Sequence, residues 1–242
     1  MGNDISPLSS NDTFKFSCTQ KISCFNECCR DLNQFLTPYD ILRLKNQLGL
    51  TSSIFLERYT TRHTGPETGL PIITLKTDSA HEFKCPFVTA SGCRVYEDRP
   101  SSCRMYPLIR VASRSRETGT VTEQYMLLKE AHCLGCKQGH QWTVRKWIEN
   151  QEVAIYNQMN DMFMEIIGLK NRLLPGPLDI KSGLMFHWAC YDLDTFRSHI
   201  FDKDLPGGWN LDPKTPYALK HDDIELLQFG FKWVKETLFG KT

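Results

Sequence analysis

The chain has 242 residues, 40% of them hydrophobic, which is enough to bury one large core or two modest ones without disulfides to hold it. Its 29 basic and 28 acidic residues are mixed along the chain, which argues against a basic face for nucleic acid. No run of about 18 apolar residues and no export signal occurs, so we expect a cytoplasmic protein without a membrane partner.

A polar terminus and two helices are predicted in the first quarter of the chain. Residues 1–13 are rich in Ser, Asn and Asp, which is typical of a poorly ordered terminus. A threonine cap, a first-turn proline and a terminal glycine then bound an apolar periodic segment: Thr37, Pro38 and Gly49. These signals predict a helix over residues 37–49, and a cap at Ser52 or Ser53 predicts a shorter one ending at Tyr59.

The middle of the chain is predicted to form a small, irregular β element. Residues 71–76, PIITLK, have the composition of a strand, and residues 92–96 suggest a second. Residues 110–124 are polar and separate two apolar runs, so we interpret them as the turn region of a hairpin.

Helices are predicted for the rest of the chain. Apolar residues recur at helical intervals over residues 142–174, and residues 184–201 and 222–239 indicate two more helices. Between them, residues 205–216 contain two adjacent glycines and three prolines, which indicate a loop. The fold class we predict is α+β, mostly helical, with the small β element carrying cysteine-rich loops.

Ten cysteines are the strongest functional signal. In a reducing cytosol, clustered thiols are metal ligands or redox groups more often than disulfides. Three of them follow or precede Pro and Gly residues in one compact segment: Cys85, Cys93 and Cys103. Four more lie within twelve residues upstream: Cys18, Cys24, Cys28 and Cys29. Their spacing matches neither a zinc-finger knuckle nor the ferredoxin pattern.

The remaining cysteines leave alternatives open. Cys133 and Cys136, with His140 after them, have the spacing of a zinc knuckle, whereas a CxxC pair alone could be a redox pair. We favour Cys133 as part of the main cage and leave Cys136 and His140 open. Cys190 follows Trp188 and Ala189 on an apolar helix face, so we interpret it as a small buried hydrophobic residue.

Two arginines near the thiols are predicted to assist the bound cofactor. Arg99 and Arg104 lie on either side of Cys103, and arginine keeps its charge while offering several hydrogen-bond donors. Such a side chain neutralises thiolates and tunes the potential of a cluster. For Arg99 a surface ion pair with a neighbouring acidic residue is the alternative.

The cysteine pattern resembles the YkgJ family of bacterial cysteine-cluster proteins, a family described as zinc- or iron-chelating. The resemblance covers about residues 18–136 and rests on the upstream cluster, CPF at 85–87, GC at 92–93 and YEDRPSSCRMYP at 96–107. It implies eight metal ligands: Cys18, Cys24, Cys28, Cys29, Cys85, Cys93, Cys103 and Cys133. The upstream spacing is longer than the family's CxxCxxCC. Flagellin lysine N-methylases share a similar cluster, so the resemblance also admits a methyltransferase relative.

We therefore expect residues 14–140 to form a cysteine-cluster metal-binding domain, with a helical region over residues 141–242 packed on it. The predicted function is to hold one or two iron–sulfur clusters, in a redox or metal-handling role with a redox or protein partner. Zinc is the alternative metal. Two other functions stay open: a cluster-dependent enzyme related to the protein lysine N-methylases, and a structural zinc module for interactions. Nucleotide-binding and hydrolase motifs are absent from the sequence, so whether the protein is an enzyme is undecided.

Overall fold

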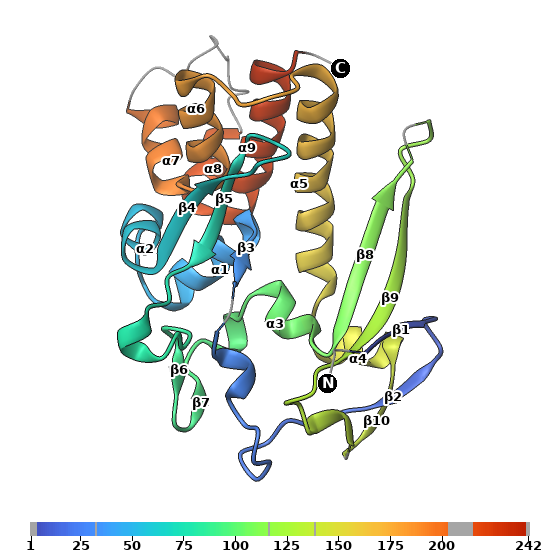
Figure 1. The fold of residues 1–242 in the computed structure, drawn as a ribbon. Coiled ribbons are helices and arrows are strands. Elements are labelled where there is room, and N and C mark those ends of the chain that lie inside the picture. Colours follow the sequence, from blue (N-terminus) through green and yellow to red (C-terminus); the bar gives the residue numbers. More distant parts are fainter. Residues whose placement is uncertain (1–3, 32, 116, 138, 203–214, 241–242) are drawn as a thin grey trace. The chain divides into compact units, whose positions relative to one another are not determined.

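The computed structural model describes residues 4–31, 33–115, 117–137, 139–202 and 215–240 (Figure 1). It is 47% helix and 20% strand, with small antiparallel sheets, which confirms the predicted α+β class with mostly helical content. Within the described residues, every helix is too short or too polar to cross a membrane.

The chain divides into two compact units. The first comprises Met1–Asn33 and Lys76–Asp161, and the second comprises Gln34–Leu75 and Met162–Thr242. The predicted division into residues 14–140 and 141–242 stays a prediction.

The first unit is built on a three-stranded antiparallel sheet with the order β1-β9-β8. Its strands are β1 (Asp4–Leu8), β8 (Leu108–Arg114) and β9 (Val121–Lys129). Figure 1 shows β8 and β9 as a long hairpin. The expectation of a poorly ordered terminus was wrong for β1, which pairs with β9 along its whole length. The predicted hairpin is present, but most of the residues expected in its turn belong to its strands.

The remaining elements of the first unit are short. Strand β2 (Thr13–Lys15) pairs with β10 (Gln141–Thr143), and β6 (Val88–Thr89) forms a hairpin with β7 (Gly92–Cys93). The helices are α3 (Ser101–Met105), α4 (Val144–Asn150) and the start of α5 (Ala154–Leu173). Single 3-10 turns lie between them: η1 (Glu27–Cys29), η2 (Ser79–His81), η3 (Tyr96–Asp98) and η4 (Gly135–Lys137).

Aromatic side chains form the core of the first unit. The ring of Trp147 packs edge-on against Phe14, Phe16 and Trp142, with centroid distances of 5.9, 5.4 and 5.3 Å. Its indole N–H donates to the carbonyl oxygen of Met105 at 3.0 Å. Edge-to-face packing of this kind adds about 0.5–1.5 kcal/mol per pair beyond the burial of apolar area. This cluster fixes α4 against β2 and the end of α3.

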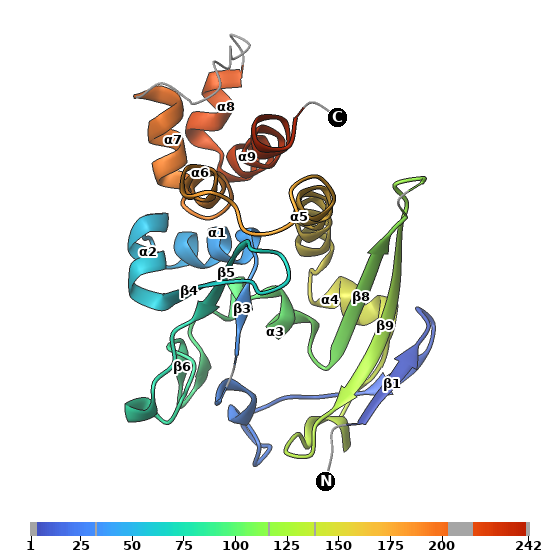
Figure 2. The same ribbon diagram turned by 45° about the horizontal axis from the view of Figure 1, so that its top comes forward.

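The second unit combines a small sheet with packed helices (Figure 2). Its sheet has the order β3-β5-β4, from β3 (Phe35–Leu36), β5 (Pro71–Leu75) and β4 (Thr60–Thr64). Its helices are α1 (Pro38–Gln47), α2 (Ser52–Tyr59), the rest of α5, α6 (Ile180–Cys190), α7 (Leu193–Phe201), α8 (Thr215–His221) and α9 (Asp223–Leu238). Helix α6 packs against both α7 and α9.

Helix caps explain where α1 and α2 begin. The predicted cap of α1 is confirmed: the Thr37 side chain accepts from the backbone N–H of Asp40, and the Asp40 carboxylate accepts from Thr37 in return. A reciprocal pair of this kind satisfies two backbone donors that the helix leaves free. Helix α2 is capped by Thr51 rather than by either serine, because the Thr51 hydroxyl accepts from the N–H of Ile54.

Two of the predicted C-terminal helices are interrupted. Residues 142–174 contain the end of β10, then α4 and α5, and Glu152 between the helices has a φ of 51°. This left-handed conformation ends a right-handed helix. Residues 184–201 are divided between α6 and α7 by a short break. The loop predicted at residues 205–216 lies outside the described residues, except that Thr215 and Pro216 begin α8.

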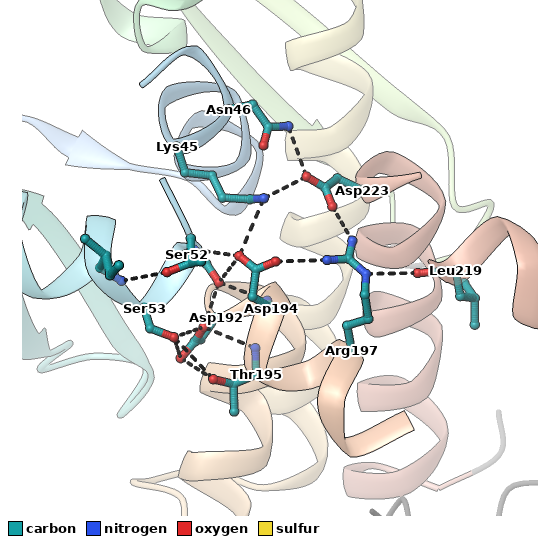
Figure 3. A network of polar contacts seen from close by, with 12 residues as sticks. Lys45, Asn46, Ser52, Ser53, Asp192, Asp194, Thr195, Arg197, Leu219 and Asp223 are labelled. Carbon is teal, nitrogen blue, oxygen red and sulfur yellow. Dashed lines mark hydrogen bonds and ion pairs between the residues drawn. The ribbon is translucent and has the colours of Figure 1, made fainter. Parts of the chain in front are cut away.

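Charged and hydroxyl side chains link the helices of the second unit (Figure 3). The Lys45 ammonium of α1 lies 2.7 Å from a carboxylate oxygen of Asp223 and 3.6 Å from one of Asp194. Arg197 of α7 pairs with the same two carboxylates. The hydroxyl of Ser52 donates to Asp194 at 3.0 Å. We call this group the ionic network; it joins α1, α2, α7 and α9.

Candidate metal centre

Nine of the ten cysteines belong to the first unit. They lie on turns and short elements rather than on long helices: Cys18 and Cys24 before η1, Cys28 and Cys29 within it, Cys85 before β6, Cys93 in β7, Cys103 in α3, Cys133 before η4 and Cys136 within it. None of these nine thiols is fully buried.

Backbone hydrogen bonds bring the upstream cysteines to the segment around Cys85. The N–H of Cys85 donates to the carbonyl oxygen of Cys29 at 2.8 Å, and Asp31 donates to Phe83 at 2.9 Å. Cys93 then lies opposite Val88 in the hairpin of β6 and β7. Sequence spacing alone does not predict this pairing, since more than fifty residues separate the two segments.

A second set of contacts brings residues 133–140 to the other end of the upstream segment. The N–H of Phe16 donates to the carbonyl oxygen of His140 at 3.0 Å, and the N–H of Ser17 donates to that of Gly135 at 3.2 Å. In addition, the backbone N–H of Leu134 donates to the sulfur of Cys24 at 3.2 Å. The predicted cage residues are therefore gathered from three regions of the sequence.

The thiols are close enough to change one another's pKa. A hydrogen bond between the two thiols lowers the pKa of Cys28 and raises that of Cys29. The same effect lowers the pKa of Cys133 to about 5 and raises that of Cys136. Burial, and after it the charge of Cys28, raises the pKa of Cys18 to about 11.

The thiols of the central segment, Cys85, Cys93 and Cys103, also interact electrostatically with other thiols. Burial raises the pKa of both Cys85 and Cys93, and charges on other thiols raise both further. The charges of Cys85 and Cys103 also add to the raised pKa of Cys29. Every one of the nine thiols takes part in at least one such interaction.

The donor set fits a thiophilic metal. Across the described part of the chain, no three His, Cys, Asp or Glu side chains converge as they stand on a point that could hold an ion. Bringing sulfurs to a shared metal therefore requires the side chains to turn and to lose their protons, because the thiolate is the ligand. Clustered thiols select zinc or iron rather than magnesium or calcium.

A buried hydroxyl group lies beside one of the thiols. The hydroxyl group of Tyr106 is buried and has no hydrogen-bond partner of ordinary geometry among the described residues. Burial raises the pKa of Tyr106, and the nearby Cys133 raises it further. The Nε of Arg104 is also buried and unpartnered in the described structure. Of the two groups, the Tyr106 hydroxyl lies next to a thiol, that of Cys133, whereas the Arg104 guanidinium donates to the carbonyl oxygens of Glu97 and Gln151. A hydroxyl group in this position can hydrogen-bond the sulfur of a ligating thiolate. Sequence analysis missed Tyr106, because nothing in its neighbourhood marks it as different from a core tyrosine.

The two predicted arginines are buried and fix the segment that carries Cys103. Arg99 is 8% exposed and donates to the carbonyl oxygen of Tyr96 and the side chain of Gln151. Arg104 is 4% exposed and donates to the carbonyl oxygen of Gln151 at 2.8 Å. Burial lowers the pKa of Arg99, whereas the charge of Cys103 opposes that shift.

The structure also shows the surroundings of Cys190 and His140. Cys190 is fully buried in α6 of the second unit, which confirms its interpretation as a small hydrophobic residue. The exposed ring of His140 packs edge-on against Trp142, with a centroid distance of 4.7 Å. The backbone N–H of His140 donates to the hydroxyl of Ser17 at 3.2 Å.

Comparison with known proteins agrees with the donor set. Residues 17–139, just over half of the chain, match the model of the CxxCxxCC family, described as "Putative zinc- or iron-chelating domain". The match includes all eight predicted ligands and Cys136. Neither the curated proteins nor the solved structures contain a match to the chain. The chain belongs to the CxxCxxCC family of zinc- or iron-chelating domains, as its resemblance to the YkgJ proteins predicted.

Proposed function

We propose that the chelated metal is iron, held as one or two iron–sulfur clusters, and that the protein has a redox or metal-handling role. The observation that carries the proposal is a set of nine thiols with the buried Tyr106 hydroxyl beside Cys133 and the Arg99 guanidinium near Cys93 and Cys103. Thiolates bind both zinc and iron–sulfur clusters, so the donors around the sulfurs are what favour iron.

Hydrogen bonds to sulfur matter more for a cluster than for a structural zinc ion. The reduction potential of a cluster is set by its net charge, by donors to its sulfurs and by solvent exposure. Tyr106 lies beside Cys133 with a hydroxyl group that has no partner of ordinary geometry in the described structure. Arg99 is near Cys93 and Cys103 and keeps its positive charge there. These groups suit an anionic cluster whose potential must be tuned.

The roles of the residues follow from their positions. The eight predicted cysteines would ligate the metal, and Arg99 and Arg104 would hold the Cys103 segment while offsetting thiolate charge. When bound, an iron–sulfur cluster would supply one-electron transfer. The partial exposure of the thiols is suited to exchange with a redox partner or a metal donor.

The test is the composition of the full-length protein purified without oxygen. We expect brown protein with broad visible absorption that contains iron together with acid-labile sulfide. Colourless protein with stoichiometric zinc and no iron would contradict the proposal and favour the structural zinc module. Iron without sulfide would favour a mononuclear site, and with it the search for an enzymatic activity.

A further inference from the structure

The loop that contains Cys133 and Cys136 contacts residues 16 and 17, which lie between the end of β2 and Cys18. Ser17 donates its N–H to the carbonyl oxygen of Gly135, so each partner in this bond immediately precedes one cysteine, Cys18 or Cys136. The two backbones are in close contact. A Cβ atom at Gly135 would lie 2.8 Å from both the Phe16 ring and the Ser17 carbonyl oxygen.

A second glycine of the loop confirms how tightly the two segments pack. Gly139 has a φ of 104°, and a Cβ there would lie 2.2 Å from the Ser17 hydroxyl oxygen. Side chains at either glycine would therefore push the loop away from Ser17. The proximity of Cys18 to the loop is set by backbone contacts and does not depend on the orientation of any thiol.

Cys24 reaches the same loop from the other side. Its sulfur accepts the backbone N–H of Leu134, which lies between Cys133 and Gly135 in the sequence. Amide donors to sulfur are characteristic of cysteine metal sites, where they stabilise the thiolate and orient it. The turn itself is closed by the N–H of Cys133 on Glu130 at 3.0 Å and that of Lys137 on Leu134 at 3.1 Å.

The spacing of Cys133 and Cys136 suits two ligands of the same metal ion. Cys133 precedes the 3-10 turn η4 by two residues and Cys136 lies within it, so the chain turns between the two cysteines. The two thiols are already within hydrogen-bonding distance of each other, as the shifts in their pKa values show. This spacing also occurs in four-thiolate zinc sites.

From this geometry we propose that Cys18, Cys24, Cys133 and Cys136 form a metal site of their own, distinct from a second site. The second site takes Cys29, Cys85, Cys93 and Cys103. The Cys85–Cys29 backbone bond and the hairpin of β6 and β7 bring the first three together, and the charge of Cys103 acts on the thiol of Cys29. Cys28 lies between the two groups, since its charge acts on the thiols of Cys18 and Cys85.

This inference rests on the proposed function only in that the thiols bind a metal. It adds Cys136, which is not among the eight ligands that the family resemblance implies, leaves Cys28 between the two groups, and assigns each of the other eight thiols to one of two sites. The backbone bonds that bring the cysteine segments together do not involve the thiols.

The experiment uses the full-length protein, stripped of metal under reducing, oxygen-free conditions and titrated with Co²⁺. Cobalt reports tetrahedral thiolate ligation by its visible d–d bands and its near-ultraviolet sulfur-to-cobalt absorption. We expect about two Co²⁺ per chain for the wild type and about one for Cys136→Ser. Cys85→Ser is the reciprocal variant and should also bind about one. The double variant should bind none, and Cys190→Ser, the matched control, should bind as the wild type does.

Each other outcome has a distinct meaning. Wild-type binding and spectra in Cys136→Ser would overturn the assignment of Cys136 while leaving metal binding intact. Loss of all cobalt in either single variant would show one shared site and overturn the division. Failure of the wild type to bind cobalt would contradict metal binding itself, and thus the proposed function.

A folding defect in Cys136→Ser is resolved by Cys136→His, because histidine is also a ligand for tetrahedral metals. We expect that variant to bind about two Co²⁺ with weaker sulfur-to-cobalt absorption, since one sulfur ligand is lost. Two bound Co²⁺ with unchanged sulfur-to-cobalt absorption would overturn the proposal.

Discussion

The two compact units of this protein are stabilised by different means. The second has an aromatic core in which Phe186, Phe231 and Trp233 are at most 1% exposed, and the ionic network joins four of its helices. The first has short elements, a smaller aromatic cluster around Trp147 and nine cysteines on turns. We therefore expect the second unit to be stable by packing and the first to depend on the metal that its thiols bind.

The magnitudes support this contrast. A structural four-thiolate metal site contributes on the order of 10 kcal/mol of apparent binding free energy at neutral pH. The whole stability of a domain is about 5–15 kcal/mol. A metal on the thiols of the first unit would therefore supply a large share of its stability, because binding and folding draw on one free energy. We expect no such contribution from a metal to the stability of the second unit, where the only cysteine is Cys190.

The largest effect is expected from removing a central ligand. Cys85→Ser should lose one of the two bound metals and part of the soluble yield together, since the lost thiolate leaves its site incomplete and metal binding supports folding. Metal content by elemental analysis and the yield of folded protein measure this. Cys190→Ser should keep full metal content, because that thiol is buried in the second unit. The reverse pattern would break the contrast between the units.

A smaller effect is expected from the ionic network. Lys45→Met removes an ammonium group that is 6% exposed and leaves the carboxylates of Asp194 and Asp223 with Arg197 as their cation. We expect a loss of about 2–3 kcal/mol, because a carboxylate without its partner in a partly buried setting is costly. Hydrogen exchange of α9, together with urea unfolding, measures it, and metal content should not change.

The matched control for Lys45 is Lys232→Met on α9. Lys232 is 65% exposed and its ammonium lies 4.0 Å from Glu236, so its loss should cost less than about 0.5 kcal/mol. Equal destabilisation by the two substitutions would mean that the ionic network is no stronger than a surface ion pair.

The smallest effect is a dependence on pH in the second unit. Although burial opposes the shift, hydrogen bonds from Lys45 and Arg197 lower the pKa of Asp223 to about 2, below its ordinary value of 3.8. A carboxyl group with a lowered pKa stabilises the fold above its ordinary pKa, and this contribution is lost as the pH falls through about 4 to about 2. Asp223→Asn should lose about 1–2 kcal/mol at neutral pH and show a shallower fall in stability over that interval. Parallel curves for wild type and variant would exclude the assignment.

Local signals in the sequence predicted local structure well. The threonine cap and first-turn proline at Thr37 and Pro38 placed α1 correctly, because the signals act within one turn of the helix. The break at Glu152 could not be predicted, since its left-handed backbone depends on the packing of α4 against the aromatic cluster. Strand β1 was missed for a similar reason: its polar residues acquire a partner only when β9 is in place.

In the candidate site too, local features could be predicted from the sequence, whereas contacts between distant residues could not. The cysteine spacing and the family resemblance predicted which thiols are metal ligands, and that assignment stays a prediction. The apolar neighbours of Cys190 predicted a core residue, which its burial confirms. The contact of the Leu134 amide with Cys24 joins residues that are 110 positions apart, and no local pattern encodes it. The grouping of the thiols around Cys136 and the unpartnered hydroxyl of Tyr106 required the structure, because both follow from how distant turns pack.

The most direct test of the contrast between the units is hydrogen exchange measured by mass spectrometry on the full-length protein, with its metal and after chelation under reducing conditions. We expect chelation to remove protection from the turns around Cys29, Cys85 and Cys133, and from the neighbouring sheet, while protection of α6, α7 and α9 is unchanged. If the first unit keeps its protection without metal, or if both units lose protection together, the thiols do not support the fold in the way we describe.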